Sequence, residues 1–251
     1  MKSVVHDAEI LILATPAEAV KKLFDGFSEE WFRKPLIVAT KGLLEEGVYE
    51  RFSHFEMISG PGFASEILKG RRIWLTVACR GIEAKTTEGI SGDTLAETIF
   101  RNTNIVFDRT DDVRGVRLVG ALKNIYAIEA GREGLEPRTR EFTEFVEAAI
   151  REMKMILLDN GGFVETVEKV AGRGDLILTC SIEENRNYRF GRDALRERGL
   201  RWRANARRVL RELRTVEGVF GAEQIKTEGV FVPREAEILE NILRRIYAVK
   251  R

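Results

Sequence analysis

Residues 115–131 read GVRLVGALKNIYAIEAG, a largely apolar run with one lysine, Lys123, near its middle. If the run is a helix, the residues three and four positions from Lys123 share its face. These residues are Val119, Gly120, Tyr126 and Ala127. Because this stripe carries no charge and includes small residues, a ligand or another backbone segment could approach it closely. The pattern predicts a water-poor site that lowers the pKa of Lys123 toward the range useful for acid–base catalysis. The alternative is a lysine that reaches out to solvent between helices.

Composition and length indicate a soluble globular protein of one large or two ordinary domains. The 251 residues are 44% hydrophobic and 32% charged. No apolar run is long enough for a membrane helix, and the first residues do not resemble a signal peptide, which predicts a cytoplasmic protein without a membrane partner. Cys79 and Cys180 are far apart in sequence and are predicted to be reduced thiols. His6 and His54 have no candidate ligands at metal-binding spacing, so no metal site is predicted.

Two patterns divide the chain near residue 110. Apolar segments alternate with helical ones in the first part, which predicts an α/β domain with a parallel sheet. The predicted strands are 9–15, 35–40, 55–59, 73–79 and 104–108, and the predicted helices are 16–27, 91–102 and one that opens after Gly60-Pro61-Gly62. The remainder has helical periodicity, with breaks at 131–137, 160–162, 172–174, 199 and 228–233. The predicted fold class is α/β plus all-α, with domains 1–110 and 111–251.

Five segments, taken in order, resemble the NAD(P)-dependent sn-glycerol-3-phosphate dehydrogenase family. They are VATKG (38–42), ISGPGFASE (58–66), GALKNIYAI (120–128), AGRGDLILTC with NRN (171–180 and 185–187), and VEG (216–218). The resemblance implies an incomplete Rossmann-like domain over 1–110 and a helical substrate domain over 111–251. It also implies an oxidoreductase of glycerophospholipid precursor synthesis that interconverts dihydroxyacetone phosphate and sn-glycerol 3-phosphate with NAD or NADP. A homo-oligomer is compatible with it.

The resemblance also assigns site residues, motif by motif. The catalytic residues it implies are Lys123, Lys41 and Asp175, with Lys123 handling the proton at the substrate carbonyl and Asp175 orienting Lys123. The substrate-binding residues it implies are Lys41, Gly60, Asn124, Asp175, Thr179, Asn185, Arg186 and Asn187. The cofactor-binding residues it implies are Lys41, Ala64, Arg186 and Glu217, and it implies no metal.

The residues themselves support parts of this assignment, each with a plainer alternative. Lys41 follows a predicted strand at its carboxyl end, where open α/β sheets bind ligands, but it could be an exposed loop lysine. Asn185, Arg186 and Asn187 begin a predicted helix, and a helix N-terminus with an arginine suits a phosphate. Either asparagine could instead cap that helix, and Asp175 could cap another. Without the resemblance, Glu217 would be read as a surface acid.

One departure from the family pattern concerns the dinucleotide. The G-x-G-x-x-G turn that opens the family's first domain is absent, and the first predicted strand corresponds to a later one of that domain. Gly60-Pro61-Gly62 is rejected as a substitute because Pro61 has no amide donor and Ser65 occupies the third glycine position. Gly62 also replaces the usual hydroxyl residue, which removes one hydrogen bond expected to the substrate. Three alternatives stay open: a start upstream of Met1, a unit supplied by another polypeptide, or a degenerate relative that binds a phosphometabolite or regulates.

A basic block offers a different class of function. Residues 186–214 hold eleven arginines and three acids, a formal charge of +8 that could bind nucleic-acid phosphates. Helical spacing distributes these arginines around the helices rather than along one stripe, so nucleic-acid binding is disfavoured. Binding that falls steeply with added salt would support it.

Overall fold

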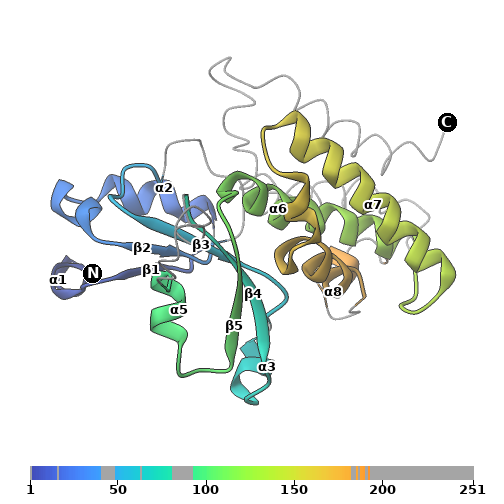
Figure 1. The fold of residues 1–251 in the computed structure, drawn as a ribbon, viewed down its shortest axis with the longest axis horizontal. Coiled ribbons are helices and arrows are strands. Elements are labelled where there is room, and N and C mark those ends of the chain that lie inside the picture. Colours follow the sequence, from blue (N-terminus) through green and yellow to red (C-terminus); the bar gives the residue numbers. More distant parts are fainter. Residues whose placement is uncertain are drawn as a thin grey trace, which may run out of the picture.

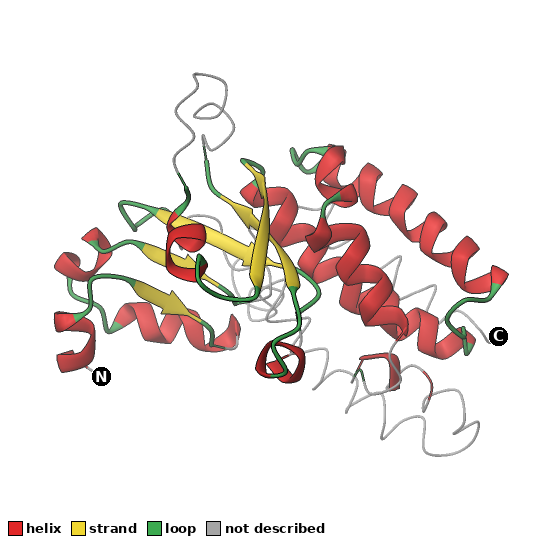
Figure 2. Cartoon of the chain, turned by 60° about the horizontal axis from the view of Figure 1, so that its bottom comes forward, coloured by secondary structure: helices red, strands yellow, loops and turns green. Residues whose placement is uncertain are grey.

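The computed structural model describes residues 2–15, 17–40, 49–62, 64–80, 93–181, 185, 187–189 and 192. Within these residues, a five-stranded sheet occupies one end of the molecule and the long helices occupy the other (Figures 1 and 2). Among the helices of these residues, none combines the length and apolar content that a membrane crossing requires. In the part of the chain that the structure describes, the strands precede residue 111 and the later elements are helical. The division into domains at residue 110 stays a prediction.

The strands follow one another across the sheet in the order of the sequence. They are β1 (Leu11–Leu13), β2 (Leu36–Val38), β3 (Phe55–Ser59), β4 (Ile73–Ala78) and β5 (Ile105–Thr110). All five were predicted, and β1 and β2 are shorter than the sequence indicates. Neighbouring strands are parallel except β3 and β4, which are antiparallel. The prediction of a wholly parallel sheet was therefore wrong at this pair.

The connection between β3 and β4 explains the antiparallel pair. A parallel crossover carries the chain back along the strand it has just left, usually in a helix. The helix in this connection, α3 (Ala64–Leu68), has 5 residues and rises only about 8 Å, less than the roughly 16 Å of a five-residue strand. The chain therefore enters β4 from the end at which it leaves β3.

Short helices connect or flank the strands of the sheet. They are α1 (Lys2–Asp7), α2 (Ala17–Asp25), the 3₁₀ turn η1 (Glu29–Arg33) and α5 (Leu95–Phe100). The sequence did not predict α1, whereas α2 and α5 are confirmed with tighter bounds. On one face, Val20 and Phe24 of α2 join the main core; on the other, Ala96 of α5 packs in a smaller cluster with Ile37 and Val77. The alternation of side chains along the strands separates these two cores.

The helical part confirms the predicted breaks at 131–137 and 160–162, whereas the predicted break at 172–174 is wrong, because a π-helical turn there runs directly into the next helix. Its elements are α6 (Val113–Glu133), α7 (Arg140–Asp159), the 3₁₀ turn η2 (Val164–Glu168), the π-helical turn η3 (Val170–Gly174) and α8 (Asp175–Ser181). Gly134, with φ of 63°, ends α6 in the left-handed conformation that glycine adopts without strain. The predicted breaks at 199 and 228–233 lie outside the described residues.

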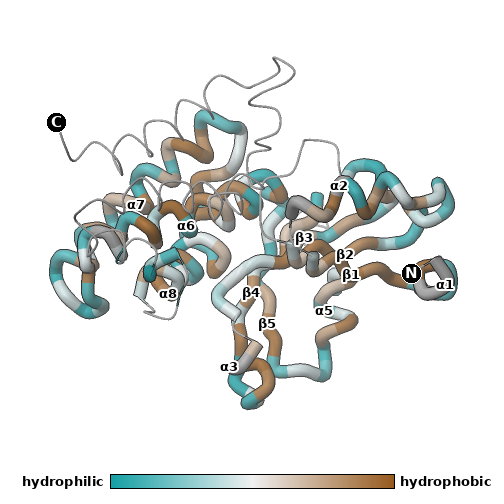
Figure 3. The backbone as a smooth tube through the Cα atoms, turned by 180° about the vertical axis from the view of Figure 1, so that it is seen from behind, coloured by the Kyte–Doolittle hydropathy of each residue, from teal (hydrophilic) through white to brown (hydrophobic). Residues whose placement is uncertain are grey.

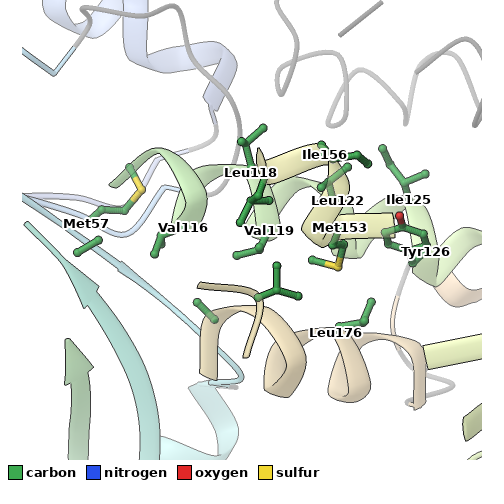
Figure 4. Packing of buried hydrophobic residues seen from close by; sticks show 14 of the residues in the cluster. Met57, Val116, Leu118, Val119, Leu122, Ile125, Tyr126, Met153, Ile156 and Leu176 are labelled. Atoms are coloured by element: carbon green, nitrogen blue, oxygen red, sulfur yellow. The ribbon is translucent and has the colours of Figure 1, made fainter. Parts of the chain in front are cut away.

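Helix α6 is the centre of the molecule. It is apolar on nearly all sides, as a helix buried on every face must be, whereas α7 alternates hydrophobic and hydrophilic positions (Figure 3). Near the sheet, Met57 of β3 lies beside Val116 of α6 (Figure 4). Farther along α6, Met153 and Leu176 lie near Leu122 (Figure 4). The stretch over 115–131 therefore joins the sheet to α7 and α8.

Candidate active site

Lys123 is buried in the middle of α6 and forms an ion pair with Asp175. Its side chain is 5% exposed and that of Asp175 is 3% exposed, and its Nζ donates a hydrogen bond to Asp175 Oδ2. The two residues are 52 positions apart in sequence, and the packing of α6 against α8 brings them together. The predicted apolar setting of Lys123 is confirmed, and the alternative in which it reaches solvent is wrong. Its catalytic role stays a prediction.

The turn before α8 places Asp175 opposite Lys123. This turn is η3, and Gly172 is required within it because a Cβ there would lie 2.2 Å from the carbonyl oxygen of Val167. The amide of Ala171 donates to Thr76 Oγ1 at 2.9 Å, which attaches the turn to β4. Asp175 is the first residue of α8, where a carboxylate also interacts favourably with the helix dipole. Thus the AGRGD segment fixes a carboxylate at a defined depth in the core.

Arg173 holds this turn from the outside. Its guanidinium bonds Glu147 of α7 and Glu168 of η2, each at 2.6 Å. The hydrogen bond from Arg173, with a second from Lys154, lowers the pKa of Glu168 to about 2. The hydrogen bond from Arg173 likewise lowers the pKa of Glu147. One side chain therefore connects three elements around the segment that positions Asp175.

Two further residues of α8 lie beside the ion pair. The hydroxyl of Thr179 donates to the carbonyl oxygen of Asp175 at 2.5 Å and lies 3.4 Å from Asp175 Oδ1. Burial raises the pKa of Cys180 to about 12, although Lys123 acts to lower it. The thiol is therefore protonated and is not a nucleophile at neutral pH. Thr179 is the polar neighbour of the pair.

A second polar group connects α6 with the segment around residue 187. Asn187 Nδ2 donates to Asn124 Oδ1 at 2.9 Å, and Asn124 Nδ2 lies 3.4 Å from the carbonyl oxygen of Gly120. Asn185 Oδ1 accepts from the backbone amides of Asn187 and Tyr188 at 2.9 and 3.3 Å. The predicted alternative of an N-capping asparagine is thus observed at Asn185. Asn124 follows Lys123 on α6, so the amide pair and the ion pair attach the same turn of this helix to two different segments.

Gly131 allows this segment to approach α6. A Cβ on Gly131 would lie 1.9 Å from the carbonyl oxygen of Tyr188 and 3.0 Å from the amide nitrogen of Arg192. The hydroxyl of Tyr188 donates to the carbonyl oxygen of Leu135 at 2.8 Å, which holds the segment at the end of α6. The small residues in the 115–131 stretch thus admit a second backbone, as their pattern predicted.

We expect Gly131→Ala to destabilise the protein even though alanine is the better helix former. The helix propensity gain is at most about 1 kcal/mol, whereas the collision with Tyr188 requires backbone movement that typically costs about 1–3 kcal/mol. Chemical denaturation measures the difference. Gly120→Ala is the matched control, because its Cβ would meet only Ser59 Oγ at an ordinary 3.5 Å. Equal stability of the two variants would contradict the close approach at Gly131.

A small pocket lies between the carboxyl ends of β2 and β3 and the first turns of α6. Its lining consists of Thr40, Met57, Ile58, Ser59, Val116, Arg117 and Gly120. The hydroxyl oxygen of Ser59 is buried and has no hydrogen-bond partner within the described residues. Gly60 follows with φ of 152°, a conformation that favours glycine, and its Cβ position is 3.1 Å from Leu75. Ser59 is thus a polar group beside a pocket with room for about one water molecule.

The structure brings together only part of the predicted site. Lys123 and Asn124 lie on α6, Asp175 and Thr179 lie on α8, and Asn185 and Asn187 lie in the segment that follows α8. Gly60 follows the pocket residue Ser59. Ala64 begins α3, beyond the turn after β3. Lys41, Arg186 and Glu217 lie outside the described residues, as does most of the basic block over 186–214. Sequence reasoning missed Thr40, Ser59 and Arg117, although Thr40 and Ser59 stand inside the VATKG and ISGPGFASE segments.

Comparisons with known proteins agree on one family. The sequence model described as NAD-dependent glycerol-3-phosphate dehydrogenase C-terminus matches residues 112–250. A glycerol-3-phosphate dehydrogenase (NAD(P)+) from Roseobacter denitrificans is 31% identical over 193 residues, which are 73% of this chain and 58% of that protein. One from Koribacter versatilis is 34% identical over 203 residues, which are 74% of this chain and 57% of that protein. The chain thus spans less than two thirds of the length of these curated relatives.

Solved structures show the same fold. The glycerol-3-phosphate dehydrogenase of Coxiella burnetii superposes with a TM-score of 0.66 at 22% identity, covering 99% of this chain and 75% of that one. That of Saccharomyces cerevisiae superposes with a TM-score of 0.69 at 18% identity, covering 99% of this chain and 74% of that one. The sheet and the helices that follow it are therefore arranged as in these enzymes.

Proposed function

The chain belongs to the glycerol-3-phosphate dehydrogenase family, and on that premise we propose that it interconverts dihydroxyacetone phosphate and sn-glycerol 3-phosphate with NAD or NADP. The observation that carries the proposal is the buried ion pair of Lys123 and Asp175. It lies in two of the five segments that resemble the family. An ammonium held in a water-poor core interacts more strongly with a developing negative charge than one in solvent does.

The chemical role of Lys123 is to handle the substrate proton. In the reduction, the carbonyl carbon gains a hydride and the π electron pair of the carbonyl becomes a lone pair on oxygen. Lys123 donates a proton to that oxygen and is left as a neutral amine; in the oxidation it takes the proton back. The bound dinucleotide supplies or accepts the hydride. Asp175 fixes the ammonium in place and balances its charge in the core.

Substrate binding in the proposal involves the polar residues beside the pair. Asn124 and Asn187, joined by a hydrogen bond, border the site with Thr179. Lys41, Asn185 and Arg186 are assigned to the substrate by the resemblance. An arginine would suit the phosphate here, because its guanidinium forms paired charge-assisted hydrogen bonds with phosphate oxygens. Ser59, Gly60 and Thr40 would contact the other side of the ligand.

The described residues do not fit the pyrophosphate of a dinucleotide. The candidate turn is Gly60-Pro61-Gly62, and the amide of Gly62 already donates to the carbonyl oxygen of Gly60 at 3.0 Å. Pro61 has no amide hydrogen, so the turn lacks the free donors that a phosphate needs. Ala64, Lys41, Arg186 and Glu217 stay proposed cofactor contacts through the resemblance. We therefore derive only proton transfer and substrate binding from the described residues.

The setting of the protein is also proposed. We place the reaction in the cytoplasm and in the supply of glycerophospholipid precursors. A truncated Rossmann-like domain over 1–110 and a helical substrate domain over 111–251 would share the site, and a homo-oligomer is compatible with it.

The test is an assay of the purified chain. NADH or NADPH absorbance is followed with dihydroxyacetone phosphate, and binding of the same compound is measured by calorimetry without the nicotinamide. We expect turnover that requires both compounds. Absence of binding and of turnover would contradict the proposed function.

One other function follows from the missing glycine turn. A catalytically degenerate family member would keep the substrate site and act as a phosphometabolite-binding or regulatory protein. Binding of dihydroxyacetone phosphate without any oxidation of NADH or NADPH would favour this alternative.

A further inference from the structure

Three side chains with metal-binding atoms gather on the face of the sheet that points away from α6. They are His54, Glu56 and Cys79, whose candidate ligand atoms all lie within 4.8 Å of one another. Spacing along the chain pointed to no candidate ligands for His54, and Cys79 is 23 positions from Glu56. The antiparallel pairing of β3 and β4 brings them together.

The register of this pair explains the cluster. Met57 pairs with Ala78 in the antiparallel register, so the next pair in that register is Glu56 and Cys79. The side chains of two residues directly opposite each other point to the same face of the sheet. His54 precedes Glu56 by two positions and shares that face as well. On this side, Cys79 packs with Ala96 of α5 in the smaller core. Met57 and Ala78 belong to the main core with α6, so the sheet separates the cluster from Lys123.

Glu56 is held rigidly in the cluster. It is 2% exposed, and its two carboxylate oxygens accept the backbone amides of Leu95 and Ala96, each at 2.8 Å. Oε1 also lies 3.1 Å from His54 Nε2. Burial of a carboxylate is costly unless it is paired or hydrogen-bonded. The two amides satisfy part of this need and leave oxygen lone pairs that face His54.

We propose that His54, Glu56 and Cys79 bind a divalent transition-metal ion of the zinc class. Imidazole, carboxylate and thiolate are the three ligand types that such ions take, and three protein ligands leave a fourth position for water. His54 binds as a neutral imidazole with its proton on Nδ1, so that Nε2 and Glu56 Oε1 both have lone pairs for the ion. The thiol of Cys79 ionises on binding, so a metal–sulfur bond forms and one proton is released to solvent.

The geometry needs only a small adjustment. Ligands on a tetrahedral zinc ion are roughly 3.3–3.8 Å apart, given its bond lengths. The candidate atoms, within 4.8 Å of one another, must therefore close by about 1–1.5 Å at most. Glu56 and Cys79 are buried, whereas the side chain of His54 is 42% exposed. Because His54 Nε2 and Glu56 Oε1 already lie 3.1 Å apart, the adjustment is an approach between the Cys79 thiol and these two atoms. The exposed edge of His54 gives the ion and the water a path.

Titration of the full chain with Co²⁺ tests the proposal. The protein is first reduced and freed of metal with a chelator. We expect one equivalent of Co²⁺ to produce a thiolate-to-cobalt charge-transfer band, and Zn²⁺ to displace it. Cys79→Ser should abolish the band. His54→Ala should weaken Co²⁺ binding more than about 100-fold, because the loss of a residue that only supports a ligand already costs up to that much.

Matched variants test whether the band arises from this cluster. His6→Ala and Cys180→Ala change the second histidine and the second cysteine, and both should keep the band. Circular dichroism checks that each variant is folded; His54 is partly exposed, so its alanine variant is expected to fold even if Cys79→Ser does not. The proposal is overturned if the native chain gives no band, or if the band persists in His54→Ala with unchanged affinity.

Discussion

Asp175→Ala is expected to lower the free energy of unfolding by about 3–5 kcal/mol, the usual cost of removing one partner of a buried ion pair. Both side chains of the pair are nearly inaccessible to solvent, at 5% for Lys123 and 3% for Asp175. Removing the carboxylate leaves the ammonium facing a gap in the core instead of its counter-charge. Urea denaturation followed by circular dichroism measures the loss.

One smaller term accompanies this loss. The carboxylate at the start of α8 also interacts with the helix dipole, which contributes about 0.3–1 kcal/mol.

An exposed ion pair shows how little charge pairing contributes without burial. Arg140 and Glu144 form one on α7 with side chains 85% and 62% exposed, so Glu144→Ala should cost only about 0.3–0.5 kcal/mol. A similar small loss for Asp175→Ala would contradict a buried pair.

A double variant separates charge from packing. Lys123→Met with Asp175→Leu replaces the pair by apolar side chains of similar size. Such replacements are often neutral or stabilising by about 1–4 kcal/mol. We therefore expect the double variant to be at least as stable as the native chain, although the single variant Asp175→Ala is not. A pair whose removal stabilises the protein would be retained for chemistry rather than for stability.

The stretch over 115–131 shows which features could be predicted from sequence. Its apolar residues occur on all sides of a helix, and only a central buried helix can satisfy that pattern. The same periodicity placed Lys123 on an uncharged stripe, and the small residues predicted a close neighbour that proved to be the backbone of Tyr188. Family resemblance then predicted Asp175 as the partner. These conclusions depend on local periodicity or on motifs, which a single sequence contains.

Features that depend on pairing between distant segments could not be predicted. The antiparallel pairing of β3 with β4 depends on how far α3 reaches, and strand periodicity does not record direction. The cluster of His54, Glu56 and Cys79 follows from that pairing, so spacing alone left His54 without candidate ligands. Ser59 was missed for another reason: its role depends on a pocket formed with Gly120, 61 residues later in the chain.

Lys123→Met is expected to reduce turnover of dihydroxyacetone phosphate by about 10²–10⁴-fold, the usual contribution of a positioned acid or base. Methionine keeps much of the apolar volume of the lysine stem but leaves the buried Asp175 carboxylate without its counter-charge, so Lys123→Met should also lose stability. Turnover is therefore compared only for protein that circular dichroism shows to be folded. Because the phosphate is assigned to other residues, binding of dihydroxyacetone phosphate should weaken far less than turnover. The NADH assay and calorimetry measure the two effects separately, and unchanged turnover would contradict the assigned role.

Lys123→Arg distinguishes proton transfer from simple charge stabilisation. Arginine preserves the positive charge and the ion pair with Asp175, so folding should survive, but its guanidinium does not release a proton in proteins. If Lys123 donates the proton, Lys123→Arg should be about as slow as Lys123→Met although it retains the charge. If the charge alone stabilised the developing alkoxide, Lys123→Arg would recover most of the native rate. We expect the first result, because a buried amine paired with one carboxylate can lose and regain a proton without leaving the core.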